Sequence, residues 1–168
     1  VRLTLAPGDY TAVISGVGGS TGTALAEVYE ETATDGSRLT NLSSRTLVRV
    51  GSEVMIAGFV VQGARPARVL IRAAGPGLAA FGVPGTLANP QLTVHAGATQ
   101  LAANDNWGAN PDAANLRSTA AAIGAFALPE GSADAALLLT LEPGNYSATV
   151  SGVNDTSGVA LVEVYQLD

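Results

Sequence analysis

Two stretches of the chain, residues 3–29 and 139–165, repeat almost the same sequence at a distance of 136 positions. The first reads LTLAPGDYTAVISGVGGSTGTALAEVY and the second reads LTLEPGNYSATVSGVNDTSGVALVEVY, so 16 of the 27 aligned positions are identical. Solenoid repeats have periods of roughly 20–50 residues, so a period this long indicates whole domains in tandem. Residues 1–30 are therefore expected to be the terminal part of one repeat unit, which precedes the main unit.

Each copy has the pattern of three short strands separated by turns. An apolar run leads into a Pro-Gly pair, a second strand begins at a tyrosine, and a Gly-containing turn precedes a third strand that ends in Glu-Val-Tyr. Proline and glycine at these places mark hairpin turns, so each copy predicts a β-meander. We expect structural roles for the recurring residues Tyr10, Glu27, Tyr29, Tyr146, Glu163 and Tyr165.

The composition favours an all-β protein. Hydrophobic residues make up 47% of the 168 residues, charged residues only 13%, and 20 residues are glycine. A chain of this length can bury a real core, and abundant glycine suits tight turns. We expect an antiparallel β-sandwich of about eight to ten strands with jelly-roll or Greek-key connections and one short helix.

The charged residues and the lack of cysteine and lysine exclude several functions. All eight basic residues are arginine and fourteen residues are acidic, so no basic stripe is present that could neutralise nucleic-acid phosphates. Without cysteine the chain has no disulfide and no thiolate metal site, and without lysine it has no lysine isopeptide crosslink. No apolar run approaches the ~18–20 residues of a membrane helix, so membrane insertion is not expected.

Turn signals divide the chain into three parts. Residues 1–30 hold the first copy, residues 31–38 read ETATDGSR and are expected to be a linker or loop, and residues 39–168 form the main sandwich unit. Short apolar runs in the main unit predict strands near 45–50, 53–61, 67–73, 91–95, 99–103 and 135–141, and the second copy closes the unit.

Two other segments of the main unit have a distinct character. The Ala-rich stretch 113–123 has no internal glycine or proline, and it follows Asn110-Pro111-Asp112, which predicts a capped helix. Residues 78–90 are expected to cross one end of the sandwich, with Phe81 and Val83 closing the core there.

Several segments together resemble a module that occurs in tandem in very large secreted or surface proteins of environmental bacteria. They are LTNLSSR, VMIAGFVVQG, RVLIRAAGPGLAAFGVPG, LAANDNWG, and the terminal LEPGNYSATVSGV and GVALVEVY. This likeness covers nearly the whole chain. The latter half, with its Asn/Asp-rich loop and PGxY strand, is also similar, more weakly, to the bacterial pre-peptidase C-terminal domain, a β-sandwich appended to secreted enzymes. The resemblance implies an extracellular or cell-surface, noncatalytic module with a binding or spacing role.

The Asn/Asp-rich loop is the candidate for a metal site. Asn104, Asp105 and Asn106, with Asp112 nearby, bring together side-chain oxygens of the kind that bind Ca²⁺. The spacing differs from that of an EF-hand, and no bidentate glutamate follows at the right distance. We therefore favour the alternative, a turn in which these side chains hydrogen-bond their own backbone. No cofactor is then expected, and Ca²⁺ would be the cofactor if the loop bound one.

Trp107, the single tryptophan, directly follows this loop. Its ring could stack on a sugar, with Asn104 and Asn106 binding the same polysaccharide. The alternative is burial at the edge of the sandwich, which is the commoner position for a large ring, and we favour it.

Strand alternation places Glu163 on the same face as Tyr165 and opposite Val162. That face is either half exposed or holds a carboxylate paired with an arginine such as Arg68 or Arg72, which would fix the strand register. We favour the half-exposed face, because both charges of a buried ion pair lose their hydration.

No catalytic residues are expected, because the single histidine, His95, is not accompanied by a GxSxG nucleophile motif. We expect a noncatalytic structural repeat module, extracellular or on the cell surface, that associates with itself or with neighbouring units and assembles head-to-tail into a fibre. The alternative is a carbohydrate-binding or adhesion module, with or without Ca²⁺.

Overall fold

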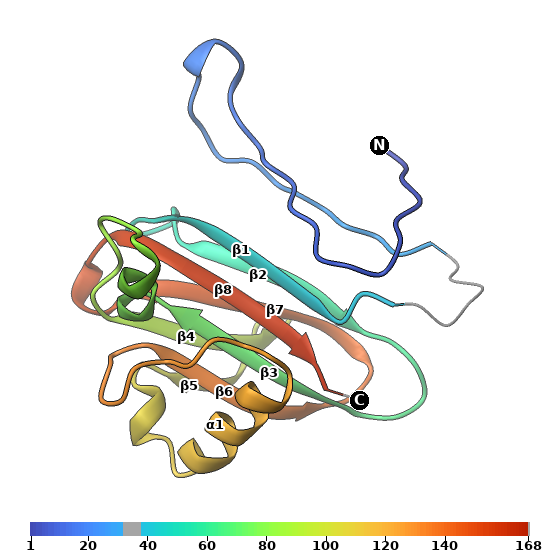
Figure 1. Ribbon diagram of the computed structural model, residues 1–168, viewed down its shortest axis with the longest axis vertical. Coiled ribbons are helices and arrows are strands. Elements are labelled where there is room, and N and C mark those ends of the chain that lie inside the picture. The colour runs from blue at the N-terminus through green and yellow to red at the C-terminus, as the bar shows by residue number, and fades with distance from the viewer. Residues whose placement is uncertain (32–37, 168) are drawn as a thin grey trace. The chain divides into compact units, whose positions relative to one another are not determined.

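A computed structural model describes residues 1–31 and 38–167. The chain divides into two compact units, Val1–Leu39 and Thr40–Asp168. The described part of the second unit contains eight β-strands and one α-helix, whereas the regular structure described in the first unit is a single 3-10 turn, η1 (Val17–Gly19) (Figure 1).

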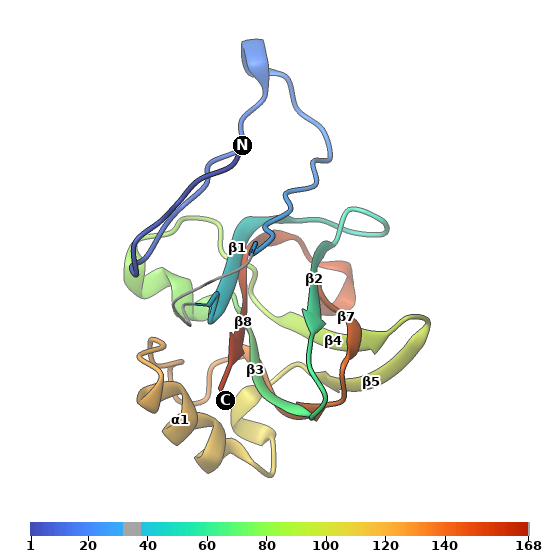
Figure 2. The same cartoon turned by 90° about the vertical axis from the view of Figure 1, so that its right-hand side faces the viewer.

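Two four-stranded sheets lie face to face in the second unit (Figures 1 and 2). The first sheet has the strand order β1-β8-β3-β6, and the second has the order β2-β7-β4-β5. All strand pairs within the sheets are antiparallel. The strands are β1 (Asn41–Val48), β2 (Met55–Val61), β3 (Ala67–Ala74), β4 (Pro90–Ala96), β5 (Thr99–Asn104), β6 (Ala135–Leu141), β7 (Gly144–Gly152) and β8 (Gly158–Gln166).

This strand order is that of a jelly roll. Apart from the β4–β5 hairpin, every connection between consecutive strands carries the chain from one sheet to the other. The predicted fold class, an antiparallel β-sandwich with one short helix, is therefore confirmed. Strand β1 begins earlier than the sequence predicts, at Asn41, because its whole length pairs with β8.

The main apolar core lies between the two sheets. Alternate residues of β3 and β8, such as Ile71 and Val162, point into it, and they meet Ala148 and Val150 of β7 from the opposite sheet. This arrangement follows from the two-residue period of side chains along a strand.

The segment between β3 and β4 crosses one end of the sandwich. It includes the 3-10 helix η2 (Pro76–Phe81), and its buried side chains are Leu78 and Leu87. Phe81 is 61% exposed, so the expectation that Phe81 closes the core is wrong. The reason is local, since the helical turn of η2 directs Leu78 inward and leaves Phe81 at its exposed end.

A second apolar cluster lies on the outer face of the first sheet, beneath α1 (Ala113–Ala122), which is drawn beside β3 and β6 in Figure 1. Leu116 of the helix meets Leu70, Trp107 and Ala136 there. The predicted helix is confirmed, but its start is not capped by the Asp112 side chain. No helix in the described part of the chain is long and apolar enough to cross a membrane.

The second copy of the repeat is not a β-meander. Strand β6 pairs with β3, β7 pairs with β2 and β4, and β8 pairs with β1 and β3. The Pro-Gly and Gly-containing turns carry the chain between sheets instead of closing hairpins. The meander prediction is therefore wrong, since each of the three strands depends on partners outside the copy.

The first copy, residues 3–29, contains no strand in the structure. Its three segments correspond to β6, β7 and β8, none of which is a ladder partner of another. Backbone N–H and C=O groups of a strand need a neighbouring strand, and in the arrangement of β6–β8 the first copy supplies no such neighbour for its own segments.

Candidate functional site

Trp107 is buried, with 3% of its surface exposed. Its Nε1 donates hydrogen bonds to the carbonyl oxygen of Pro129 at 3.2 Å and to Oγ of Ser132 at 3.3 Å. The guanidinium of Arg117 lies 5.3 Å from the ring centroid. The ring is thus a packing element beneath α1, and stacking on a sugar would require it to leave this position.

The Asn/Asp-rich loop uses its polar groups inside the fold. Oδ1 of Asn104 accepts a hydrogen bond from the N–H of Ala136 at 3.0 Å, and its Nδ2 donates to the carbonyl oxygen of Asn106 at 3.2 Å. The loop that carries Asp105 is therefore tied to β6. The structure brings Asn104 and Asn106 together, as a shared site would require. The contact, however, is made by the backbone carbonyl of Asn106 and not by its side chain.

Asp112, the remaining candidate Ca²⁺ ligand, is exposed at the start of α1. Its Oδ2 accepts a hydrogen bond from Nδ2 of Asn115 at 3.3 Å, and its own N–H donates to Oδ1 of Asn110 at 2.9 Å. Across the described residues, no three side chains of histidine, cysteine, aspartate or glutamate gather closely enough to hold a metal ion.

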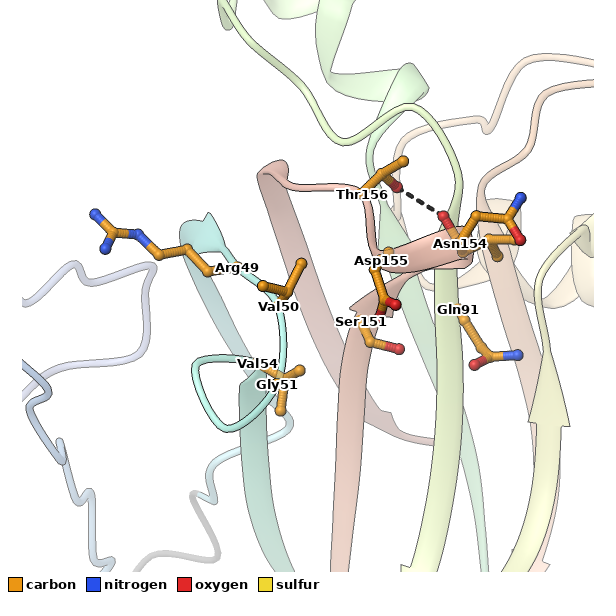
Figure 3. A pocket seen from close by; sticks show the side chains of 11 residues that line it. Arg49, Val50, Gly51, Val54, Gln91, Ser151, Asn154, Asp155 and Thr156 are labelled. Carbon is orange, nitrogen blue, oxygen red and sulfur yellow. Dashed lines mark hydrogen bonds between the residues drawn. The ribbon is translucent and has the colours of Figure 1, made fainter.

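An open hollow of about 500 Å³ lies between the β1–β2 loop and the turn that follows β7 (Figure 3). This turn is η4 (Val153–Asp155), in which Asn154 and Asp155 have positive φ angles of 56° and 55°. Thr156 Oγ1 donates a hydrogen bond of 2.9 Å to the carbonyl oxygen of Val153. Its lining includes Arg49 and Val54 of the β1–β2 loop, Gln91 of β4, Ser151 of β7 and Asp155 of η4.

A buried polar network lies on the outer face of the first sheet. Arg72 and Glu163 are direct partners across β3 and β8. Nε of Arg72 donates a hydrogen bond of 2.8 Å to Oε2 of Glu163, and Nη2 lies 2.8 Å from the same oxygen. The hydroxyl of Tyr165 donates a hydrogen bond of 2.7 Å to the other carboxylate oxygen, Oε1. Both oxygens of Glu163 are thus engaged.

The loop after α1, which contains Phe126, covers this network. Nη1 of Arg72 donates a hydrogen bond of 2.7 Å to the carbonyl oxygen of Phe126. The Phe126 ring lies 4.3 Å from the guanidinium carbon, and Phe81 packs edge-on against Phe126. Arg72 is 1% exposed, so the half-exposed face favoured from the sequence is wrong. The cover comes from a loop far away in the sequence, which strand alternation does not reveal.

The network changes the acidity of one of its members. Burial, the hydrogen bond to Glu163 and the negative charge of that carboxylate all raise the pKa of Tyr165 above its usual value of 10.0. A phenolate formed here would lose hydration and lie beside a carboxylate, so the neutral hydroxyl is favoured.

The first copy repeats the local hydrogen bonds of the second. The hydroxyl of Tyr10 donates to the carbonyl oxygen of Ala6 at 2.7 Å, as that of Tyr146 does to Glu142 at 2.7 Å. Tyr29 donates to Oε1 of Glu27 at 2.9 Å, which matches the bond of 2.7 Å between Tyr165 and Glu163.

The Gly-containing turn is also repeated. Gly18 and Gly19 of η1 have φ angles of 65° and 75°, the same left-handed conformation as Asn154 and Asp155 of η4. A Cβ on Gly16 would lie 1.8 Å from the carbonyl oxygen of Ser20, so only glycine fits before this turn. Residues 3–29 therefore hold the turn and side-chain geometry of β6–β8 without their ladders.

The first unit does not bury its own apolar side chains. Ile14 is 59% exposed, whereas its counterpart Val150 is fully buried. Val28 is 59% exposed, whereas its counterpart Val164 is 8% exposed. The residues that fill a sandwich core in one copy are thus without a core in the other.

Fold and repeat define the protein as a jelly-roll β-sandwich preceded by a segment, residues 3–29, that repeats the sequence of its last three strands. No family model and no curated protein matches the sequence. The fold is similar to the crystal structure of the pre-peptidase C-terminal domain of collagenase from Bacillus anthracis, with 12% sequence identity and a TM-score of 0.44. That similarity covers 74% of this chain and 89% of the collagenase domain.

Proposed function

We propose that this chain is a noncatalytic structural repeat module of an extracellular or cell-surface protein, in which residues 3–29 complete the jelly roll of a neighbouring repeat unit. The observation that carries the proposal is that the first copy has the local geometry of a packed copy without a core to pack in. It has the turns and hydrogen bonds of β6–β8, but its apolar side chains have no core in their own unit.

The apolar positions of the first copy match those that fill the core in the second. Burying one aliphatic side chain contributes roughly 1.5–3 kcal/mol, so several together would favour insertion into an incomplete sandwich. The matched pairs are Leu5 and Leu141, Ala12 and Ala148, Ile14 and Val150, Ala24 and Ala160, Ala26 and Val162, and Val28 and Val164.

The topology explains why the partner is a sandwich of the same type. Without β6, β7 and β8, the first sheet would lose two of its four strands and the second sheet would lose β7 from between β2 and β4. The remaining strands would form a groove that fits three segments in this order and spacing. A unit completed by the segment that leads into the next unit is joined to it, and repetition of this join produces a fibre.

A fused protein tests the proposal. Residues 40–136 are placed directly upstream of Val1. Val1 then follows residue 136 just as its counterpart Leu137 does in the main unit, so the first copy stands at the same distance from the added strands as the second copy does from its own. Amide hydrogen exchange is then measured on residues 3–29. We expect protection close to that of residues 139–165, whereas these amides in the original chain exchange rapidly. Rapid exchange in the fused protein as well would contradict the proposal.

Two matched variants of the fused protein control for nonspecific collapse. Ile14→Asp places a charge at a position whose counterpart, Val150, is fully buried, so it should abolish the protection. Val13→Asp changes the adjacent residue, whose counterpart Thr149 lies outside the core clusters, so it should leave the protection in place. Equal effects of the two substitutions would indicate collapse without strand pairing.

A further inference from the structure

The buried network of Arg72, Glu163 and Tyr165 has a half-formed counterpart in the first copy. Glu27 and Tyr29 keep the hydrogen bond between carboxylate and hydroxyl, at 2.9 Å. Among the described residues, however, the ion pairs of the structure do not include Glu27. The first copy thus presents an oriented carboxylate without a cation.

We propose that Glu27 selects the partner of residues 3–29, which is a sandwich of this same type that carries an arginine at the position of Arg72. This inference rests on the proposed function. In the complex Glu27 takes the place of Glu163, and Tyr29 takes the place of Tyr165.

The chemistry of the groove makes the carboxylate necessary. Arg72 is 1% exposed and lies beneath Phe126, so its charge has no access to water when the sandwich is complete. A segment that fills the groove without a carboxylate at this position leaves a buried guanidinium unpaired, which is strongly destabilising. Apolar segments of similar shape without the glutamate would therefore be rejected.

The same pair fixes the register of the inserted strand. Glu163 lies opposite Arg72 of β3 on one side and opposite Ser43 of β1 on the other. Because strand side chains alternate between faces, a slip of one residue would turn the glutamate into the apolar core. Glu27 would thus admit only the register in which Val28 is directed to the core, as Val164 is.

The pairing of Glu27 with Arg72 can be tested within this chain, because its own sandwich offers the same groove to the first copy once the second copy is displaced. Asn41 of β1 is the direct partner of Tyr165, so Tyr29 in that position would be joined to Asn41 by the eleven residues 30–40. A loop of this length easily spans two adjacent strands at up to ~3.3–3.6 Å per residue. The substitution Val150→Asp places a charge in the core and disables the second copy, so the first copy can replace it.

The test compares glutamate substitutions in the full chain with and without Val150→Asp. In the parent chain, Glu163→Gln should lower Tm by about 10 °C, and Glu27→Gln should leave Tm unchanged. In the Val150→Asp chain the order should reverse, so that Glu27→Gln lowers Tm and Glu163→Gln does not. Size-exclusion chromatography shows which groove the first copy enters. A monomer means that the first copy enters the groove of its own chain, and a dimer means that it enters the groove of a second chain.

Two results in this series would overturn the inference. The first is an unchanged Tm on Glu27→Gln in the Val150→Asp chain, which would leave the proposed function intact because docking would not need the glutamate. The second is an equal Tm for Val150→Asp and for the double variant with Ile14→Asp, which would mean that the first copy contributes nothing to that chain.

The fused protein decides the matter if Val150→Asp does not fold. There a double-mutant cycle joins Glu27→Gln with Arg72→Met in the upstream unit, and exchange protection of residues 3–29 is the readout. Nonadditive loss of protection supports the pairing of Glu27 with that arginine, and additive loss overturns it. Lack of protection in the unsubstituted fused protein, by contrast, would count against the proposed function itself.

Discussion

Arg72 and Glu163, which are 91 positions apart in the sequence, form a hydrogen bond of 2.8 Å beneath the loop that follows α1. The pair crosses from β3 to β8 and so joins the middle of the sandwich to its last strand. What the pair contributes to the free energy of folding depends on whether both charged partners are present. An ion pair that is buried and fully paired has a modest net effect, whereas removal of one partner exposes the full desolvation cost of the other.

We expect Glu163→Gln to lower the free energy of unfolding by about 3 kcal/mol, because the guanidinium of Arg72 would remain buried without a counter-charge. Urea denaturation provides the measurement. The matched control is Glu53→Gln, which removes the carboxylate of the exposed pair between Arg49 and Glu53 and should change stability by about 0.5 kcal/mol or less. Similar losses for the two variants would show that the buried pair has no special role.

The pH dependence of stability should report Tyr165. Its pKa in the folded state is raised above the unfolded value of 10.0, so the folded state keeps the proton where the unfolded state has lost it. The resulting stabilisation is fully present below about pH 10 and is lost as the pH rises further. Tm should therefore decline more steeply above this pH for the parent than for Tyr165→Phe.

The control for this titration is Tyr29→Phe. Tyr29 also has a raised pKa, caused first by its hydrogen bond to Glu27, but it belongs to a unit with no sheet of its own. Its replacement should leave the alkaline decline of Tm in place. A decline that survives in Tyr165→Phe and disappears in Tyr29→Phe would contradict the assignment.

Asp134 should be as important for stability as the ion pair. Its side chain is fully buried, and Oδ1 accepts hydrogen bonds from the N–H groups of Gly75 at 2.7 Å and Gly77 at 3.1 Å. Oδ2 accepts a hydrogen bond of 2.6 Å from Ser132. Asp134→Ala would leave buried donors unsatisfied and should cost about 3 kcal/mol. The exposed Asp9→Ala serves as the control in the same denaturation experiment.

The repeat offers a matched test of burial by substituting equivalent residues in the two copies. Val150→Ala removes two methyl groups from the core and should cost about 2 kcal/mol. Ile14→Ala removes more apolar surface, but from a residue that its own unit leaves 59% exposed, so the expected cost is below about 0.5 kcal/mol. Thermal unfolding of the two single variants measures both, and a comparable loss from Ile14→Ala would mean that Ile14 is packed in the isolated chain.

Local patterns in the sequence predicted the strands well but not their partners. The apolar runs near 67–73 and 135–141 became β3 and β6 with nearly the expected bounds. The Pro143-Gly144 turn, however, fits a hairpin and a crossing between sheets equally well as a local pattern. The chain crosses between sheets here because β7 pairs with β2 and β4, which are far away in the sequence.

The buried polar groups were the least predictable part of the site. Alternation placed Glu163 and Tyr165 on one face, as found, and Arg68 and Arg72 were the arginines named as candidate partners. The burial of that face depends on Phe126, whose position no local pattern fixes. Asp134 was missed, although the sequence offered two signals, a lone aspartate within the apolar run SADAALLL and the backbone N–H groups of Gly75 and Gly77, which lie outside the predicted strands and need an acceptor.

Trp107 provides the test that separates the structural role from carbohydrate or Ca²⁺ binding. Because the ring is buried and its Nε1 is hydrogen-bonded to Pro129 and Ser132, its fluorescence should be that of a shielded indole and should not respond to polysaccharides, Ca²⁺ or EDTA. Arg117→Ala, which removes the guanidinium near the ring, is the control that shows the emission can respond to its surroundings. A saturable change on addition of a polysaccharide would favour the binding module, and a change with Ca²⁺ that EDTA reverses would place an ion in the Asn104–Asn106 loop.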